Sequence, residues 1–499
     1  MSELADDMAS VMPIQPQTAS VQELFEVFIE LWNHPDPTIQ LALIFFGIFL
    51  GIPFIGGCFI IIYNWTKVDG DRPPKAVSYI PFIGVFWEYS REPVEFLRKQ
   101  FNRRGPVFYV DTIARESLVL TGEDHITDCS HPKQQSTSHL LYMGDQMGSL
   151  FNKTYRQKLP SFLKIASEFF QSSQFIEVNR QGLNEFLEAR LGSHLGSKSI
   201  DLFSISSGIY LNSMIYLFFG KKIAEEFGSD LVDEFHTGQL NLKFSLSRLV
   251  ASYGIPIGPE SQFDKFAKSL EKIASDELER RLEEKSNIVY TDYLQYAIDK
   301  KLSKVDRDVF WSHLAHMILS AHANTTASIA FTTYHLARDK KLKKKAFTNP
   351  IIMNACLTET SRRYSSISVP RTILGETEMH GYKLTPNSTI FGAPAVTLLD
   401  EKLYDSPLEY NPDRWIKKNV ETFKKRGKLL TFNGYYFDIP FESFFTQLTQ
   451  EIAIPLLFAY DVHLNSTNDL FINYWATVCT PWSSCMVSFG TEDDEKKVQ

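Results

Sequence analysis

The chain has 499 residues, of which 44% are hydrophobic, 13% are aromatic and 22% are charged. This composition excludes intrinsically disordered, collagen-like and disulfide-scaffold proteins. The 51 basic and 59 acidic residues give a formal charge of −8, which argues against nucleic acid as a partner. The five cysteines are scattered and form no C-x-x-C pair, so we predict no metal site.

Residues 41–63 (LALIFFGIFLGIPFIGGCFIIIY) contain no charged side chain. As a helix these 23 residues span about 35 Å, which is enough to cross a hydrocarbon core of about 30 Å. Seven acidic residues and no lysine or arginine precede the segment, whereas Lys67, Arg72 and Lys75 follow it. We therefore predict one transmembrane helix with the main domain in the cytosol, because positive charge stays on the cytosolic side.

Charge and composition divide the chain into five predicted parts. They are an acidic N-terminal segment (1–40), the transmembrane helix (41–63), a Pro-rich hinge (64–84), one large domain (85–490) and a charged tail (491–499). Prolines in the hinge break helix locally and stiffen the exit from the membrane. No internal repeat or linker divides the large domain.

Hydrophobic periodicity predicts a mostly helical domain with short strands. It begins with a helix over 89–104 and two strands, 107–111 and 115–120, around a turn near 112–114. Further helices are predicted at 159–175, 178–191, 203–219, 263–284, 290–300, 306–338 and 351–364. Strands follow at 371–374, 382–384 and 390–391, then a helix at 442–458 and strands at 459–464 and 486–489.

The large domain contains three polar motifs. Glu359 and Arg362 form an E-x-x-R, whose spacing puts both charges on one helix face. The segment NPDRW at 411–415 follows and supplies a third polar group, Arg414. Upstream, a long apolar helix carries AHANTT at 321–326. With the anchor and the Pro-rich hinge, these motifs resemble the E-x-x-R, P-x-R-[FW] and A-G-x-[DH]-T-[TS] motifs of the cytochrome P450 superfamily.

The resemblance is nearest to the sterol 14α-demethylases and runs from about residue 73 to 490. It includes PPKAVSYIPFIGVFWEYSREPVEFLRK near the start, SVPRTILGETEMHGYKLTPNSTIFGAPA after the E-x-x-R, and CTPWSSCMVSF at the end. It implies the cytochrome P450 fold, which is mostly α with a small β-rich lobe, here behind one N-terminal transmembrane helix.

The resemblance also implies residue roles. Glu359, Arg362 and Arg414 correspond to a structural triad on the proximal side of the haem. Arg371 corresponds to a haem-propionate ligand, since a guanidinium suits a carboxylate. Arg156, with Lys158, lies where the family often keeps further propionate contacts, although a solvated helix face is an equal alternative. The family's oxygen-relay positions are occupied by Asn324 and Thr325.

The proximal loop departs from the family pattern F-G-x-G-x-[HR]-x-C-x-G. Here residues 432–441 read FNGYYFDIPF, so Ile439 stands at the position of the cysteine ligand, or Asp438 after a one-residue slip. The basic position is Phe437, and two glycine positions are Tyr435 and Phe441. Because Ile439 has no lone pair to give to iron, conventional monooxygenase chemistry is not expected. We therefore expect no cofactor, or haem only with atypical ligation.

The predicted helix that carries residues 321–326, on the distal side of the haem in the family, also departs from the family pattern. His322 replaces the small glycine, and Asn324 replaces an acid and cannot titrate. His322 is interpreted either as a replacement iron ligand or as a satisfied or channel-lining histidine, and Tyr435 or Tyr436 as a phenolate ligand is a further alternative. His313 and His316 lie three residues apart without a third ligand, which favours a structural role over a metal pair.

These observations lead to three functional hypotheses. The first is a degenerate, non-monooxygenase member at the endoplasmic reticulum membrane that binds a sterol or other lipid or supports a partner enzyme. The second is an active biosynthetic enzyme that oxidises a sterol or terpenoid with atypical haem ligation or rearranges it without haem. The third is a membrane scaffold, for which Gly47 and Gly51 offer a helix-pairing G-x-x-x-G, a pattern also common in membrane helices generally.

Overall fold

The computed structural model describes residues 72–76, 85–112, 115–122, 137–138, 152–171, 173–195, 199–242, 262–284, 291–365, 369–416, 442–466, 468–474 and 479–490. All of them belong to the larger of two units, which comprises Gly70–Ala76 and Val85–Gln499. The predicted transmembrane helix at 41–63, the loop at 432–441 with Ile439, and the tail at 491–499 lie outside the described residues.

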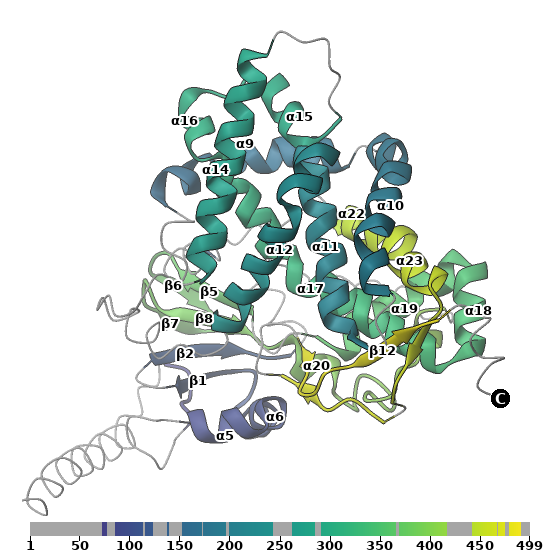
Figure 1. Cartoon of the computed structure of the whole chain (residues 1–499). Helices are drawn as coiled ribbons and strands as arrows, with labels where there is room; N and C mark the ends of the chain where they lie inside the picture. Colours follow the sequence, from purple (N-terminus) through teal and green to yellow (C-terminus); the bar gives the residue numbers. More distant parts are fainter. Residues whose placement is uncertain are drawn as a thin grey trace, which may run out of the picture. The chain divides into compact units, whose positions relative to one another are not determined.

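Helices make up most of the described residues, which confirms the predicted class (Figure 1). Before the central helix they are α5 (Phe86–Arg91), α6 (Pro93–Arg104), α9 (Lys153–Phe170), α10 (Ser173–Leu195), α11 (Leu202–Phe219), α12 (Lys221–Leu242), α14 (Gln262–Glu283), α15 (Tyr293–Asp299) and α16 (Lys304–Asp308). From the central helix onward they are α17 (Phe310–Arg338), α18 (Lys340–Thr348), α19 (Pro350–Arg363), α20 (Pro394–Leu398), the 3-10 turn η3 (Pro412–Trp415), α22 (Glu442–Gln447), the π-helix η5 (Leu448–Ala453) and α23 (Ile454–Ala459).

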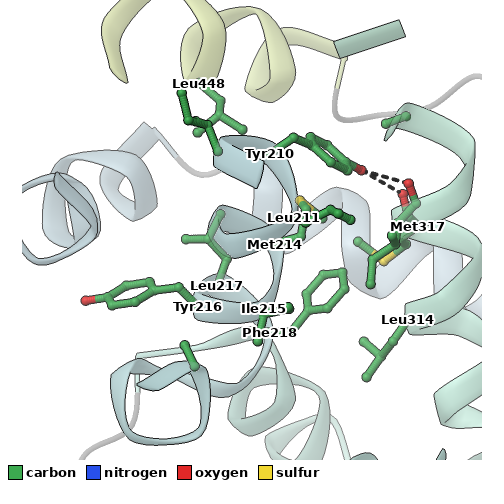
Figure 2. Close-up of a cluster of buried hydrophobic side chains, with 14 of the residues drawn as sticks. Tyr210, Leu211, Met214, Ile215, Tyr216, Leu217, Phe218, Leu314, Met317 and Leu448 are labelled. Carbon is green, nitrogen blue, oxygen red and sulfur yellow. Dashed lines mark hydrogen bonds between the residues drawn. The ribbon is translucent and has the colours of Figure 1, made fainter. Parts of the chain in front are cut away.

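The core lies where α11 packs against α17. Nearly every side chain of α11 is buried, because apolar residues occupy all of its faces. Among the described residues, α11 is the one helix long and apolar enough to cross a membrane, and 78% of that stretch is buried inside the protein. Figure 2 shows how Tyr210 on α11 points to α17, where its hydroxyl donates to the carbonyl of Ile318 at 2.9 Å and to that of Met317 at 3.3 Å.

Short strands form several small sheets. The largest has the order β1-β2-β8-β5-β3, with β1 (Val107–Thr112), β2 (Arg115–Leu120), β8 (Thr389–Gly392), β5 (Val369–Ile373) and β3 (Thr137–Ser138). Its β2–β8 pair is parallel and aligns Leu118 with Ile390, so it joins distant parts of the chain. The other sheets are β4-β12-β9 (Ile200–Asp201, Met486–Phe489, Val462–Leu464), β6-β7 (Thr377–Met379, Tyr382–Leu384) and β10-β11 (Ile472–Asn473, Thr480–Pro481).

Several element boundaries differ from the sequence prediction. Helices α12 and α18 were not predicted; α12 contains Gly228, a poor helix former, which lies against α10 and α11. The single helix predicted at 306–338 is divided at Val309 into α16 and α17. The helix predicted at 442–458 contains the π-helix η5, which precedes Pro455, because proline lacks the N–H that an α-helical ladder requires there.

Candidate functional site

The E-x-x-R motif lies on α19 as a buried ion pair. Arg362 donates from Nε to Oε2 of Glu359 at 2.9 Å and from Nη2 to Oε1 at 2.8 Å, and neither side chain is exposed. Nη1 also donates to the carbonyl oxygen of Leu398 at 2.9 Å, and Nη2 to that of Pro407 at 2.8 Å. A buried pair is tolerated when hydrogen bonds satisfy its other donors and acceptors, and these two carbonyl oxygens do so for both terminal nitrogens of Arg362.

Three further donors reach the Glu359 carboxylate from the segment at 411–415. They are the Asn411 amide at 3.0 Å, Arg414 Nε at 3.3 Å and Trp415 Nε1 at 2.9 Å. Arg414 also donates from Nη2 to the carbonyl of Ser406 at 2.9 Å. The structure thus brings Glu359, Arg362 and Arg414 together and holds η3 against α19.

The segment at 321–326 lies in the middle of α17. His322 and Thr325 are buried, whereas Asn324 is half-buried. The Thr325 hydroxyl has no hydrogen-bond partner among the described residues. A buried hydroxyl without a partner costs free energy unless a ligand satisfies it. Within the motif at 321–326, Thr325 is therefore the residue suited to contact a bound group, although the hydroxyls of Ser312 and Thr333 on the same helix are also buried without a described partner.

His322 is bonded to neighbouring helices. Its Nε2 lies 2.6 Å from the Oγ of Ser207 on α11, and the same Oγ lies 2.6 Å from Nε2 of His236 on α12. The His322 ring also packs against Phe235, with ring centroids 4.6 Å apart. Burial lowers the pKa of His322 to about 3 and also lowers the pKa of His236, so both are neutral near pH 7. This geometry is that of a satisfied core histidine.

His313 and His316 each have a tyrosine partner. His313 Nε2 lies 2.8 Å from the Tyr293 hydroxyl, and His316 Nδ1 lies 2.7 Å from the Tyr155 hydroxyl. Burial lowers the pKa of His313 well below its usual value. In the ranges that the structure describes, no three histidine, cysteine or carboxylate side chains are placed to hold a metal ion.

The two predicted propionate ligands lie on different elements. Arg371 is half-buried on β5, where its backbone faces Ile390 of β8. Arg156 is half-buried in the first turn of α9, next to Tyr155. Both are therefore accessible enough to bind an acidic group, but their roles stay predictions.

The described cysteines do not offer a thiolate. Cys356, Cys479 and Cys485 are buried and free, and Cys479 donates from Sγ to the carbonyl of Ser365 at 2.9 Å. Burial raises the pKa of Cys356 and of Cys485 to about 12 and raises that of Cys479 as well, so all three are neutral thiols. In the described ranges, no cysteine is therefore available as a thiolate ligand.

Comparison with known proteins identifies the family to which this chain belongs. A family model described as Cytochrome P450 matches residues 73–434. The chain is 22% identical over 450 residues to a cytochrome P450 monooxygenase, pynD, of Aspergillus niger, covering 83% of this chain and 92% of the relative. It is 22% identical to human 24-hydroxycholesterol 7-alpha-hydroxylase, covering 82% and 91%, and 21% identical to human lanosterol 14-alpha demethylase, covering 71% and 74%.

A solved structure shows the same fold. Cyanobacterial CYP120A1 with bound retinoic acid superposes with a TM-score of 0.64 at 14% identity, covering 84% of this chain and 99% of that one. The resemblance drawn from the sequence motifs is thereby confirmed. The expectation of no cofactor is wrong, because the matched family and its relatives are haem-binding cytochromes.

Proposed function

This chain belongs to the cytochrome P450 family, and we propose that it is a membrane-anchored member that binds a sterol-like lipid without thiolate-dependent monooxygenation. The observation that carries the proposal is the loop FNGYYFDIPF at 432–441, which contains no cysteine. The next cysteine in the chain is Cys479, a buried neutral thiol beside β11 that already bonds to Ser365.

The chemical consequence follows from the proximal ligand. In this family haem supplies oxygen activation, which a thiolate favours by pushing electron density onto iron. Ile439 offers no lone pair, and the side chains of Tyr435 and Phe441 stand where the pattern requires glycines. A neutral His322, held by Ser207, and an amide at Asn324 leave α17 without a titrating group for proton delivery at these positions near pH 7.

The lipid part of the proposal rests on the relatives and on α17. Two of the similar proteins act, by their names, on lanosterol and on 24-hydroxycholesterol. Sterols are apolar molecules with one or two hydroxyl groups. The unpartnered Thr325 hydroxyl suits such a ligand, since apolar pockets fix orientation with a few placed polar groups.

The membrane part rests on residues 41–63 and on the charge asymmetry around them, which also favour the cytosolic face of the endoplasmic reticulum. Phe49→Arg with Phe54→Arg places two charges near the centre of this segment. Each charge costs about 3 kcal/mol there, so the variant should leave the membrane fraction at alkaline pH. A double variant at surface positions, Lys265→Arg with Lys272→Arg, serves as the control and should stay membrane-bound.

The test of the chemistry uses the full-length protein, expressed with haem precursor and purified in detergent. We expect a reduced, carbon-monoxide-treated spectrum without a thiolate-type band, and no sterol oxidation with reductase and NADPH. Sterols should still bind, as measured by displacement of a fluorescent sterol. A thiolate-type band together with NADPH-dependent sterol oxidation would overturn the proposal, and so would failure of every sterol and related lipid to bind.

A further inference from the structure

Helix α18 carries an unusual concentration of positive charge. Its sequence KKLKKKAFT places lysines at 340, 341, 343, 344 and 345, which we call the lysine face. Four of them are exposed, and Lys343 lies with its Nζ 4.8 Å from the centre of the Phe458 ring. Among the described residues, no carboxylate forms an ion pair with any of these five ammonium groups.

The positive charges on α18 repel one another and are not balanced by nearby described carboxylates. Lys340 repels Lys344, and Lys341 repels Lys345, because residues four apart are neighbours on a helix surface. Lys340 and Lys341 also stand in the first turn, where the helix dipole disfavours positive charge. Asp339 caps the helix and accepts from the amides of Lys341 and Leu342, each at 2.9 Å, so it offsets only part of this charge.

Apolar side chains border the lysine face. Phe347 is 42% exposed and packs edge-on against Phe458, with ring centroids 5.3 Å apart. Ile351, at the start of α19, is 68% exposed. The surface therefore suits an acidic segment that also has an apolar residue.

The chain itself supplies such a segment at this place. Gly490, the last described residue, donates from its amide to the carbonyl of Asp461 at 3.4 Å, and Asp461 in turn bonds to the carbonyl of Phe458 at 3.1 Å. Phe458 is the residue that touches Lys343 and Phe347. The tail that follows, TEDDEKKVQ, has four consecutive acidic residues and a valine. Nine residues reach up to about 30 Å, more than twice the length of α18, about 13 Å.

From the charge complementarity, the reach and the point of departure, we propose that the tail at 491–499 binds in cis to the lysine face of α18. Its carboxylates at 492–495 offset the unpaired lysines. The inference does not depend on the lipid or haem chemistry proposed above.

The direct test is zero-length carbodiimide crosslinking of the full-length protein in detergent, followed by peptide mass spectrometry. We expect crosslinks between the tail carboxylates and the exposed lysines of α18, within one chain and weakened by salt, since exposed ion pairs are screened. Tail crosslinks that go only to other lysines, or that occur only between two chains in an isotope-mixing experiment, would overturn the proposal.

A second measurement uses lysine acetylation rates. Neutralising the tail (Glu492→Gln, Asp493→Asn, Asp494→Asn, Glu495→Gln) should speed acetylation of the α18 lysines about threefold or more at low salt, because several screened pairs are lost together. Lys272, exposed on α14, is the internal control and should not change. The matched variant Lys496→Gln with Lys497→Gln keeps the carboxylates and should preserve the protection. Equal acetylation rates in all three proteins would show that the tail does not cover α18.

Discussion

Arg362 and Glu359 form a bidentate pair, with Nε 2.9 Å from Oε2 and Nη2 2.8 Å from Oε1, although neither side chain contacts solvent. The pair also joins α19 to the chain around residues 398–415, through carbonyl oxygens on one side and η3 donors on the other. One ion pair thus connects α19 to the carbonyl oxygens of Leu398 and Pro407 and to the segment at 411–415.

Glu359→Gln should therefore be strongly destabilising. The substitution leaves the Arg362 charge buried without its counterion, which costs about 3–5 kcal/mol. Equilibrium denaturant unfolding of the purified protein measures the loss. Glu95→Gln breaks a partly exposed pair with Arg98 on α6 and should change stability by less than about 1 kcal/mol. Similar losses for the two variants would contradict the assigned role of the buried pair.

Ser207→Ala tests the bond between α11 and the distal helix. Without the hydroxyl, His322 Nε2 loses its contact with Ser207 Oγ at 2.6 Å, and Thr326 Oγ1, at 3.5 Å, is too far for a strong hydrogen bond. An unsatisfied buried nitrogen costs about 1–3 kcal/mol. Ser204→Ala removes an exposed hydroxyl from the same helix and should cost clearly less. If the two variants unfold at the same denaturant concentration, the Ser207 hydroxyl is not a structural bond.

Local spacing explains which parts of this site could be predicted. Glu359 and Arg362 lie three residues apart on one helix, so their pairing could be inferred from the sequence before any tertiary contact was known. Ser207 and His322 are 115 residues apart, and Ser207 and His236 are 29 apart. No periodicity links these residues, because they meet only when α11, α12 and α17 pack together.

The same limit applies to the fold. The amphipathic pattern predicts the helix at 351–364 to within a residue at each end, and the strand at 486–489 matches β12. The parallel pairing of β2 with β8 and the π-helix η5 depend on tertiary packing and on Pro455, and local patterns do not encode them. The prediction for Ile439 concerns residues outside the described part and stays a prediction.

His322 should make the stability of the protein depend on pH. In the unfolded chain its pKa is near 6.5, whereas burial holds it at about 3 in the folded protein. The unfolded state therefore binds the proton first, and stability falls as pH decreases from about 6.5 toward 3, by up to about 1.4 kcal/mol per pH unit for this group. His322→Gln should reduce the slope of unfolding free energy against pH in that window. Ser207→Ala keeps the imidazole and should keep most of the slope.

The proximal loop can be tested by restoring the family residues. Tyr435→Gly, Ile439→Cys and Phe441→Gly together return the thiol and the two small positions. With haem precursor supplied, this triple variant should show a thiolate-type reduced carbon monoxide band, because thiolate ligation determines that signature, and the natural protein should not show it. Ile439→Cys alone should not, since the bulky neighbours remain. A thiolate-type band already present in the unaltered protein would show that another cysteine ligates the iron.

Thr325→Val tests whether the buried Thr325 hydroxyl, which lowers the stability of the protein, binds a ligand. The two side chains have nearly the same shape, and the Thr325 hydroxyl is buried without a described partner. In the absence of lipid the variant should be more stable by about 1 kcal/mol, because a buried polar group without a hydrogen bond is removed. Sterol affinity should fall about tenfold, the effect of losing one hydrogen bond to a ligand hydroxyl. Thr326→Val, one position along, is the matched control, since the Thr326 hydroxyl faces His322. A variant that loses stability and keeps its sterol affinity would show that Thr325 serves the packing of α17 and not a ligand.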